Sequence, residues 1–196
     1  MKKLILASSL AVATSFATAH AAEPLSYNYV DGFYNVVDFG DSIGPISQLD
    51  GFGIRGSIEL GGGFFAHTGY RNSTRRSITL RDFTLGGGYA HYISPSALLY
   101  GTLDYRNLSA SGPGSSESTD GLGLSAGVRG LVSPNMELRG GIRYDDFGRD
   151  AFGRRTDETF AELGAQFNIN RNLGLIGEVQ ISSDDSQYLA GVRYSF

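Results

Sequence analysis

The chain of 196 residues contains no cysteine, which excludes a disulfide framework and any thiolate metal site. It has no run of about 18 consecutive apolar residues, so a helical membrane protein is excluded as well. Lysine is absent after Lys3, and every later basic residue is arginine. An acidic chain without basic runs argues against nucleic acid as a partner.

The first residues have the pattern of a secretory signal peptide. Lys2 and Lys3 are basic, residues 4–16 are mostly apolar, and Ala19-His20-Ala21 is a small-x-small cleavage motif. We therefore expect residues 1–21 to be removed and residues 22–196 to form a single domain. Removing Lys2 and Lys3 from the 16 basic residues leaves 14 against 20 acidic ones, a net charge of −6.

The rest of the chain alternates between apolar and polar residues, which is typical of strands whose two faces have different surroundings. The clearest example is 51–60, where Phe52, Ile54 and Ile58 alternate with Arg55 and Glu59. We predict ten strands. They cover residues 25–39, 51–60, 64–71, 78–93, 98–108, 121–131, 136–147, 158–169, 173–182 and 188–196.

The predicted connections alternate in length. Short turns such as Ser94-Pro95-Ser96 alternate with longer polar loops, among them residues 109–119, and outer-membrane barrels show this asymmetry. We also expect a β-bulge at Asp31-Gly32, where the alternation of the first strand breaks. An even number of strands places both ends of the chain at the same end of the sheet.

The last nine residues alternate strictly and finish on an aromatic residue. They resemble the C-terminal strand of bacterial outer-membrane β-barrels, and the resemblance implies that Tyr188, Val192, Tyr194 and Phe196 form a signal for the barrel-assembly machinery. Residues 22–196 as a whole resemble the small outer-membrane barrel family that includes the OmpA transmembrane domain, OmpX and the opacity proteins. The resemblance implies a protein of the Gram-negative outer membrane, surrounded by its lipid and lipopolysaccharide, and we expect a monomer.

No amphipathic helix is present to cover an apolar sheet face, as a soluble β-sandwich would require a second layer to do. We therefore predict an all-β fold, a closed antiparallel up-and-down transmembrane β-barrel of about ten strands with eight as the alternative, apolar outside and charged inside. The predicted interior charges are Arg55, Glu59, Asp82, Asp104, Arg106, Arg129, Glu137, Arg139, Arg143, Asp145, Glu162, Glu178 and Arg193.

Glycines on neighbouring strands leave room for these large side chains. To within about two residues, the expected pairs are Arg55 with Gly69, Asp104 with Gly88, Arg106 with Gly86, Arg139 with Gly127, Arg143 with Gly123, and Glu178 with Gly164 or Gly191. Arginine suits such an interior because its guanidinium group binds carboxylates in bidentate fashion.

Residues suited to catalysis or metal binding are few. His67 near Ser57 and Glu59 superficially resembles the constellation of a lipid A deacylase, but those enzymes work at the lipid-facing surface, and we interpret His67 as an interior imidazole. Asp145-Asp146 and Asp184-Asp185 could hold Ca²⁺ loosely, although solvated carboxylates are the simpler interpretation. We predict no catalytic, cofactor-binding or metal-binding residue.

Four arginines, Arg71, Arg75, Arg76 and Arg81, fall at the predicted external end. Arginine binds phosphate in bidentate fashion, so these residues are candidate lipopolysaccharide contacts, with a solvated loop as the alternative. Three functions remain open: a barrel with a role in envelope structure or cell-surface interaction, a narrow passive porin-like channel for small solutes, and a lipid-modifying enzyme. We favour the first, and no enzyme.

Overall fold

The computed structural model describes residues 25–40, 47–149, 155–183 and 185–196. The predicted signal peptide lies outside these residues and stays a prediction. Within them the structure has strands and connections but no helix, and hence none long and apolar enough to cross a membrane. The ten strands are β1 (Tyr29–Asp38), β2 (Gln48–Gly61), β3 (Phe64–Arg75), β4 (Ile78–Ser94), β5 (Ala97–Gly112), β6 (Ser115–Ser133), β7 (Met136–Arg149), β8 (Arg155–Asn168), β9 (Leu173–Ile181) and β10 (Ser186–Ser195).

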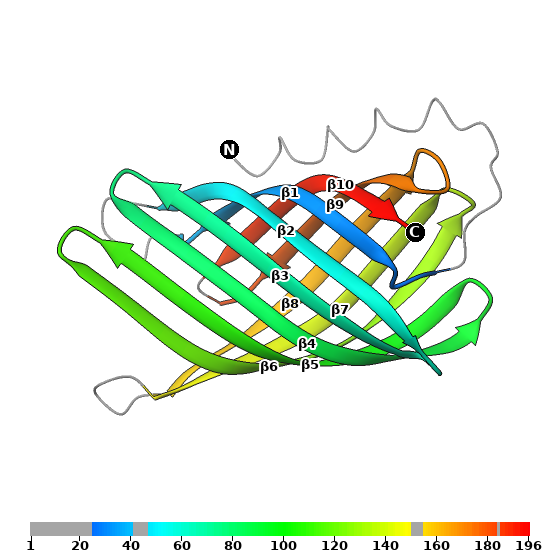
Figure 1. The fold of residues 1–196 in the computed structure, drawn as a ribbon, viewed down its shortest axis with the longest axis horizontal. Coiled ribbons are helices and arrows are strands. Elements are labelled where there is room, and N and C mark those ends of the chain that lie inside the picture. Colours follow the sequence, from blue (N-terminus) through cyan, green and yellow to red (C-terminus); the bar gives the residue numbers. More distant parts are fainter. Residues whose placement is uncertain (1–24, 41–46, 150–154, 184) are drawn as a thin grey trace.

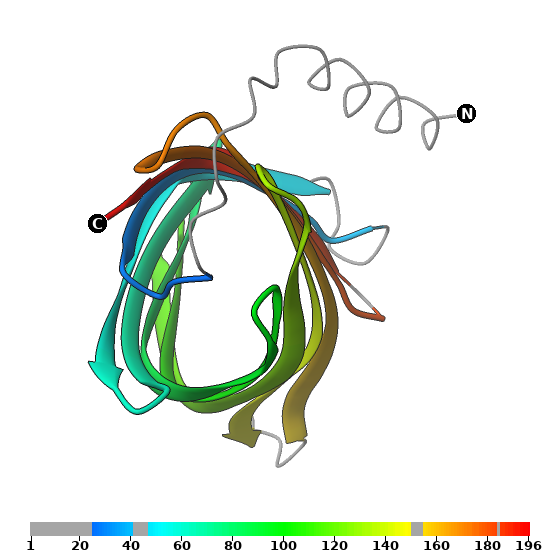
Figure 2. The same ribbon diagram turned by 90° about the vertical axis from the view of Figure 1, so that its right-hand side faces the viewer.

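Each strand pairs antiparallel with its neighbours in sequence, and β1 pairs with β10 to close the barrel (Figure 1). The predicted fold is confirmed with ten strands, and the eight-strand alternative is wrong. β1 starts and β10 ends at the same end of the barrel, which we call the terminal end, and Figure 2 looks into it. The opposite end is called the far end.

The predicted long loop at residues 109–119 is wrong. β5 and β6 continue through it as a hairpin whose turn is Pro113-Gly114, with a φ of 84° at Gly114. Serines face each other across the hairpin, and the hydroxyl oxygens of Ser111 and Ser116 lie 3.3 Å apart. This part of the two strands could not be recognised from the sequence, because both of its faces are polar. The alternation of apolar and polar residues on which the prediction depends is therefore absent there.

The predicted bulge at Asp31-Gly32 is also wrong, since β1 pairs with β10 and β2 without a register shift over residues 29–38. Asp31 faces the lumen with none of its surface exposed, while Val30 faces outward. The inward face of β1 mixes polar Asp31 and Asn35 with apolar Phe33 and Val37, so period-two alternation is obscured there.

The outer face of the barrel is apolar. Phe52 is 71% exposed and Leu163 is 64% exposed, whereas Arg106, Arg143 and many other charged side chains are buried. Closure of the barrel satisfies the backbone hydrogen bonds of every strand, and the apolar exterior suits lipid rather than water. The residues of the predicted assembly signal follow this pattern in β10 and after it: Val192, Tyr194 and Phe196 are exposed, and Tyr188 is half-buried.

Candidate functional site: the charged lumen

Twelve of the thirteen predicted interior charges meet inside the barrel. The exception is Glu59, which is exposed at the terminal end and accepts a hydrogen bond from the backbone N–H of Tyr27 at 2.8 Å. The other twelve lie inside the barrel together with two that the sequence analysis did not assign to the interior, and all of these except Asp104, which lies against His67, form ion pairs. Seven arginines thus face seven carboxylates: Arg55, Arg71, Arg106, Arg129, Arg139, Arg143 and Arg193 against Asp31, Asp82, Asp104, Glu137, Asp145, Glu162 and Glu178.

The first group of ion pairs, the Glu178 cluster, joins β1, β2, β7, β9 and β10. Oε2 of Glu178 lies 2.9 Å from Nη1 of Arg55, which donates a hydrogen bond to it, and 2.5 Å from Nη2 of Arg139. Asp31 accepts a hydrogen bond from Nε of Arg55 at 2.5 Å, and it accepts two further hydrogen bonds from Arg193 at 2.7 and 2.9 Å. Arg55 and Glu178 lie on strands separated by β1 and β10, so this pair joins strands that are not neighbours in the barrel.

The second group, the Asp82 cluster, lies on β3, β4, β5, β7 and β8 and contains Arg71, Asp82, Arg106, Arg143, Asp145 and Glu162. Nη2 of Arg106 lies 2.5 Å from Asp82, and Arg106 also binds Asp145. Arg143 donates to Asp145 at 3.0 Å and to Glu162 at 2.8 Å. Buried carboxylates held by two guanidinium groups are strong, geometrically specific contacts.

The prediction that Arg71 contacts lipopolysaccharide is wrong, because its side chain points into the barrel. Arg71 binds Asp82 there and donates to Oε1 of Gln187 at 2.7 Å. Tyr70 faces outward, so the alternation along β3 turns Arg71 inward. The other three residues of that set, Arg75, Arg76 and Arg81, are exposed on the hairpin of β3 and β4 at the far end.

Two of the predicted charge–glycine pairs have the predicted register: Arg55 with Gly69, and Glu178 with Gly164. The other four are each displaced by two residues, which is within the expected precision, so that Asp104 pairs with Gly86 rather than Gly88. A Cβ atom at Gly86 would overlap Oδ1 of Asp104, so glycine is required to make room for the carboxylate.

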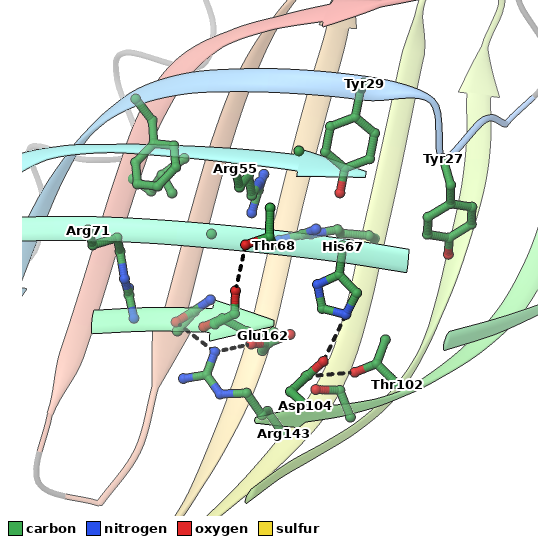
Figure 3. Close-up of a pocket in the computed structure, with 18 of the residues that line it drawn as sticks. Tyr27, Tyr29, Arg55, His67, Thr68, Arg71, Thr102, Asp104, Arg143 and Glu162 are labelled. Carbon is green, nitrogen blue, oxygen red and sulfur yellow. Dashed lines mark hydrogen bonds and ion pairs between the residues drawn. The ribbon is translucent and has the colours of Figure 1, made fainter. Parts of the chain in front are cut away.

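The lumen contains a central cavity of about 180 Å³ (Figure 3). On its wall, Nε2 of His67 lies 2.8 Å from Oδ1 of Asp104, and the Thr102 hydroxyl donates to the other Asp104 oxygen at 3.0 Å. Ser57 pairs with His67 in register, but its buried hydroxyl has no hydrogen-bond partner within the described part of the chain. Glu59 is bound elsewhere, so the His67, Ser57 and Glu59 constellation is not assembled.

The described residues contain no group of three or more histidine, aspartate or glutamate side chains that could hold a metal ion. Asp145 lies in the lumen, where Arg106 and Arg143 bind it, so the Asp145-Asp146 pair does not share one face. Asp184, the other residue considered for calcium, lies outside the described residues.

Residues 25–28, which we call the terminal strap, turn into the terminal mouth of the barrel (Figure 2). The Tyr27 ring stacks on Phe65 at a centroid distance of 3.8 Å, and the guanidinium carbon of Arg129 lies 4.5 Å from the centroid of the same tyrosine ring. Arg129 also donates to the carbonyl oxygen of Ser26 at 3.2 and 3.3 Å. Leu25 and Tyr27 of the strap form a buried apolar cluster with Phe65, Ala90 and Leu98. A further cavity, of about 360 Å³, lies at the terminal end and is lined by Leu25 and Ser26 of the strap.

A family model described as outer membrane protein beta-barrel domain matches residues 7–160. Among solved structures, the NanC porin aligns with a TM-score of 0.53 at 9% identity, over 85% of this chain and 100% of that chain. The KdgM porin in complex with disordered oligogalacturonate aligns with a TM-score of 0.50 at 12% identity, over 86% of this chain and 99% of that chain. Neisserial surface protein A has a TM-score of 0.43 at 19% identity, over 87% and 98%. No curated protein matches the chain. At these identities, the two porins show likeness of fold alone.

Proposed function

The chain belongs to the outer membrane protein beta-barrel domain family, and from this premise we propose that it is a sealed barrel. In this proposal it has a role in envelope structure or cell-surface interaction, and its far end, with the β3–β4 and β5–β6 hairpins, faces outward from the cell. The observation that carries the proposal is the set of buried ion pairs inside the lumen, some of which join strands that are not neighbours, among them Arg55 with Glu178.

Apolar side chains support a seal at both ends of the lumen. At the terminal end these are the strap residues Leu25 and Tyr27 with Leu98, and at the far end Val37 and Phe160 are almost completely buried. A ten-stranded barrel has room for a thread of water, and in this proposal the charged and apolar side chains inside the barrel interrupt that thread. We further infer that the protein is not an enzyme, since His67 is engaged by Asp104 deep in the lumen.

The second candidate is a narrow passive channel, which the cavities of about 180 and 360 Å³ favour. Conductance in planar bilayers distinguishes the two. We expect the refolded barrel to give no steady openings over a range of voltages, in bilayers where a porin of known conductance opens normally. Regular openings of uniform size would exclude the sealed barrel and support the channel.

We also propose that Arg75, Arg76 and Arg81 bind lipopolysaccharide phosphates. Arg81 lies on the outer face of β4, two residues beyond Phe83, and pairs in register with Asn72. Phe83 and Tyr70 face outward as a cross-strand aromatic pair, which is typical of the membrane–water interface, so the three arginines lie where lipid phosphates begin.

Replacing Arg75, Arg76 and Arg81 together by glutamine is expected to remove most of the lipopolysaccharide that co-purifies with the barrel, because three phosphate contacts are lost. Lipopolysaccharide per barrel is measured after mild detergent extraction. Arg171→Gln, an exposed arginine at the terminal end, is the matched control and should retain the wild-type amount. Equal lipopolysaccharide in all three proteins would show that the three arginines are merely solvated.

A further inference from the structure

The central cavity is lined by more cationic than anionic side chains. All seven lumen arginines line it, whereas only three of the seven lumen carboxylates do: Asp82, Asp104 and Glu162. Figure 3 shows two of these arginines, Arg55 and Arg143, on different sides of this space. The charge that a small solute meets at the wall of the cavity is therefore mainly positive.

The Glu178 cluster contains the excess of positive charge. It has three guanidinium groups, those of Arg55, Arg139 and Arg193, but only two carboxylates, those of Asp31 and Glu178. The Asp82 cluster has three of each, and the remaining lumen arginine forms a pair with a single glutamate. One guanidinium charge in the Glu178 cluster is therefore not balanced by a carboxylate that binds it.

The seventh lumen carboxylate, Asp104, does not supply the missing negative charge. It lies on β5, which is opposite β10 in the strand order of the barrel. Its partners are Nε2 of His67 at 2.8 Å and the Thr102 hydroxyl at 3.0 Å, and among the described residues no arginine forms an ion pair with it.

The arginines of the Glu178 cluster face the central cavity, while its two carboxylates do not line it. The side chains of Arg55 and Arg139 are 18% and 22% exposed, whereas those of Asp31 and Glu178 are at most 5% exposed. Glu178 borders instead a separate void of about 10 Å³, together with Arg139 and Arg193. A solute in the central cavity can therefore reach the guanidinium groups without contacting these carboxylates.

We propose that the central cavity binds one small monovalent inorganic anion, of the size of chloride, against the arginines of the Glu178 cluster. A buried charge without a counter-ion is strongly unfavourable, and a monovalent anion supplies the one negative charge that the cluster lacks. A dianion such as sulfate would exceed that charge by one. Tyr100 and Ser125 also line the cavity, and a hydroxyl group can donate a hydrogen bond to the anion.

Unfolding in matched salts tests for this anion. The mature barrel is refolded in detergent with chloride, bromide, sulfate or gluconate at equal ionic strength, and urea unfolding is followed on heat-modifiability gels. Chloride or bromide at ten times its dissociation constant is expected to lower the unfolding equilibrium constant about tenfold, and the effect should saturate. Gluconate, which is much larger, should have no saturable effect. Equal stability in chloride and gluconate, or an effect of sulfate as large as that of chloride, would overturn the proposal.

Arg139→Gln leaves the Glu178 cluster with two guanidinium groups and two carboxylates, so the dependence of stability on chloride should be lost. Arg139→Lys restores the charge and should restore the dependence. Arg76→Gln removes an exposed arginine from the β3–β4 hairpin and should behave as the wild type. An unchanged dependence on chloride in Arg139→Gln would exclude this site.

Anomalous diffraction from bromide locates the anion without any variant, and it decides the question also if Arg139→Gln does not fold. Wild-type crystals grown in bromide should give an anomalous peak in the central cavity beside the Glu178 cluster. Peaks only at exposed arginines such as Arg76 would indicate an adventitious ion only and would overturn the proposal.

Discussion

Glu178→Gln is expected to lower the free energy of unfolding of the barrel by about 3–5 kcal/mol, because it leaves buried guanidinium groups without their carboxylate. Only 5% of the Glu178 side chain is exposed, and Arg55 and Arg139 both bind it. Glutamine keeps the shape of the side chain but supplies one neutral acceptor in place of a shared negative charge. Urea unfolding in detergent, followed by the heat-modified band shift on gels, measures the difference.

Asp120→Asn is the matched control for Glu178→Gln. Asp120 also accepts two hydrogen bonds, from Tyr105 at 2.5 Å and Asn107 at 2.7 Å, but it is exposed on β6. Its loss should cost no more than about 1 kcal/mol. The double variant Glu178→Gln, Arg139→Gln removes one of the uncompensated cations and should be more stable than Glu178→Gln alone. A double variant that is less stable than the single one would show that the charge pairing is not the cause.

The charged interior was predictable from the sequence because arginines and carboxylates recur on the polar face of alternating strands. Residues 51–60, which include Arg55, show this most clearly, since the apolar side chains of Phe52, Ile54, Ile58 and Leu60 are all on the other face. The partners were less predictable, because closure brings together strands that are distant in sequence. Nothing in the local pattern indicates that Arg55 on β2 lies against Glu178 on β9.

Two interior charges were missed for different physical reasons. Asp31 lies on a strand whose inward face also carries Phe33 and Val37, so that the polar face could not be recognised from its composition. For Arg71 the signal was present: Tyr70 faces outward, and its neighbour must then face inward if the strand continues. The prediction ended the strand at residue 71, while β3 extends to Arg75.

The terminal strap was predicted as the start of the first strand, since Tyr27 and Tyr29 continue the alternation. In the structure the strand starts later: the first residue of β1 that pairs with its neighbours is Tyr29, opposite Ser195 of β10 and Ser57 of β2. Before that residue the chain leaves the sheet and makes contacts inside the mouth instead. The alternation of a sequence therefore marks which residues can form a strand, while the register of barrel closure sets where the strand begins.

Tyr27→Ala is expected to speed access of water-soluble reagents to the central cavity by about a hundredfold or more. Truncating a buried aromatic side chain costs about 3–5 kcal/mol, and each 1.4 kcal/mol lost from the closed strap raises its open population about tenfold. Because the chain has no cysteine, Thr102→Cys supplies a single thiol reporter in the central cavity. The rate of its modification by a charged methanethiosulfonate reagent measures the opening.

The strap variant needs controls for general loosening of the barrel. Tyr34→Ala removes a tyrosine from the outer face, where 42% of its surface is exposed, and should leave the modification rate of the central-cavity thiol unchanged. A second reporter, Ser73→Cys, lines a cavity of about 130 Å³ toward the far end of the lumen and should react at the same slow rate with or without Tyr27. If Tyr27→Ala accelerates both reporters equally, the barrel as a whole has loosened. If it accelerates neither, the stacking of Tyr27 on Phe65 does not control the terminal mouth, and the ion pairs alone close the lumen.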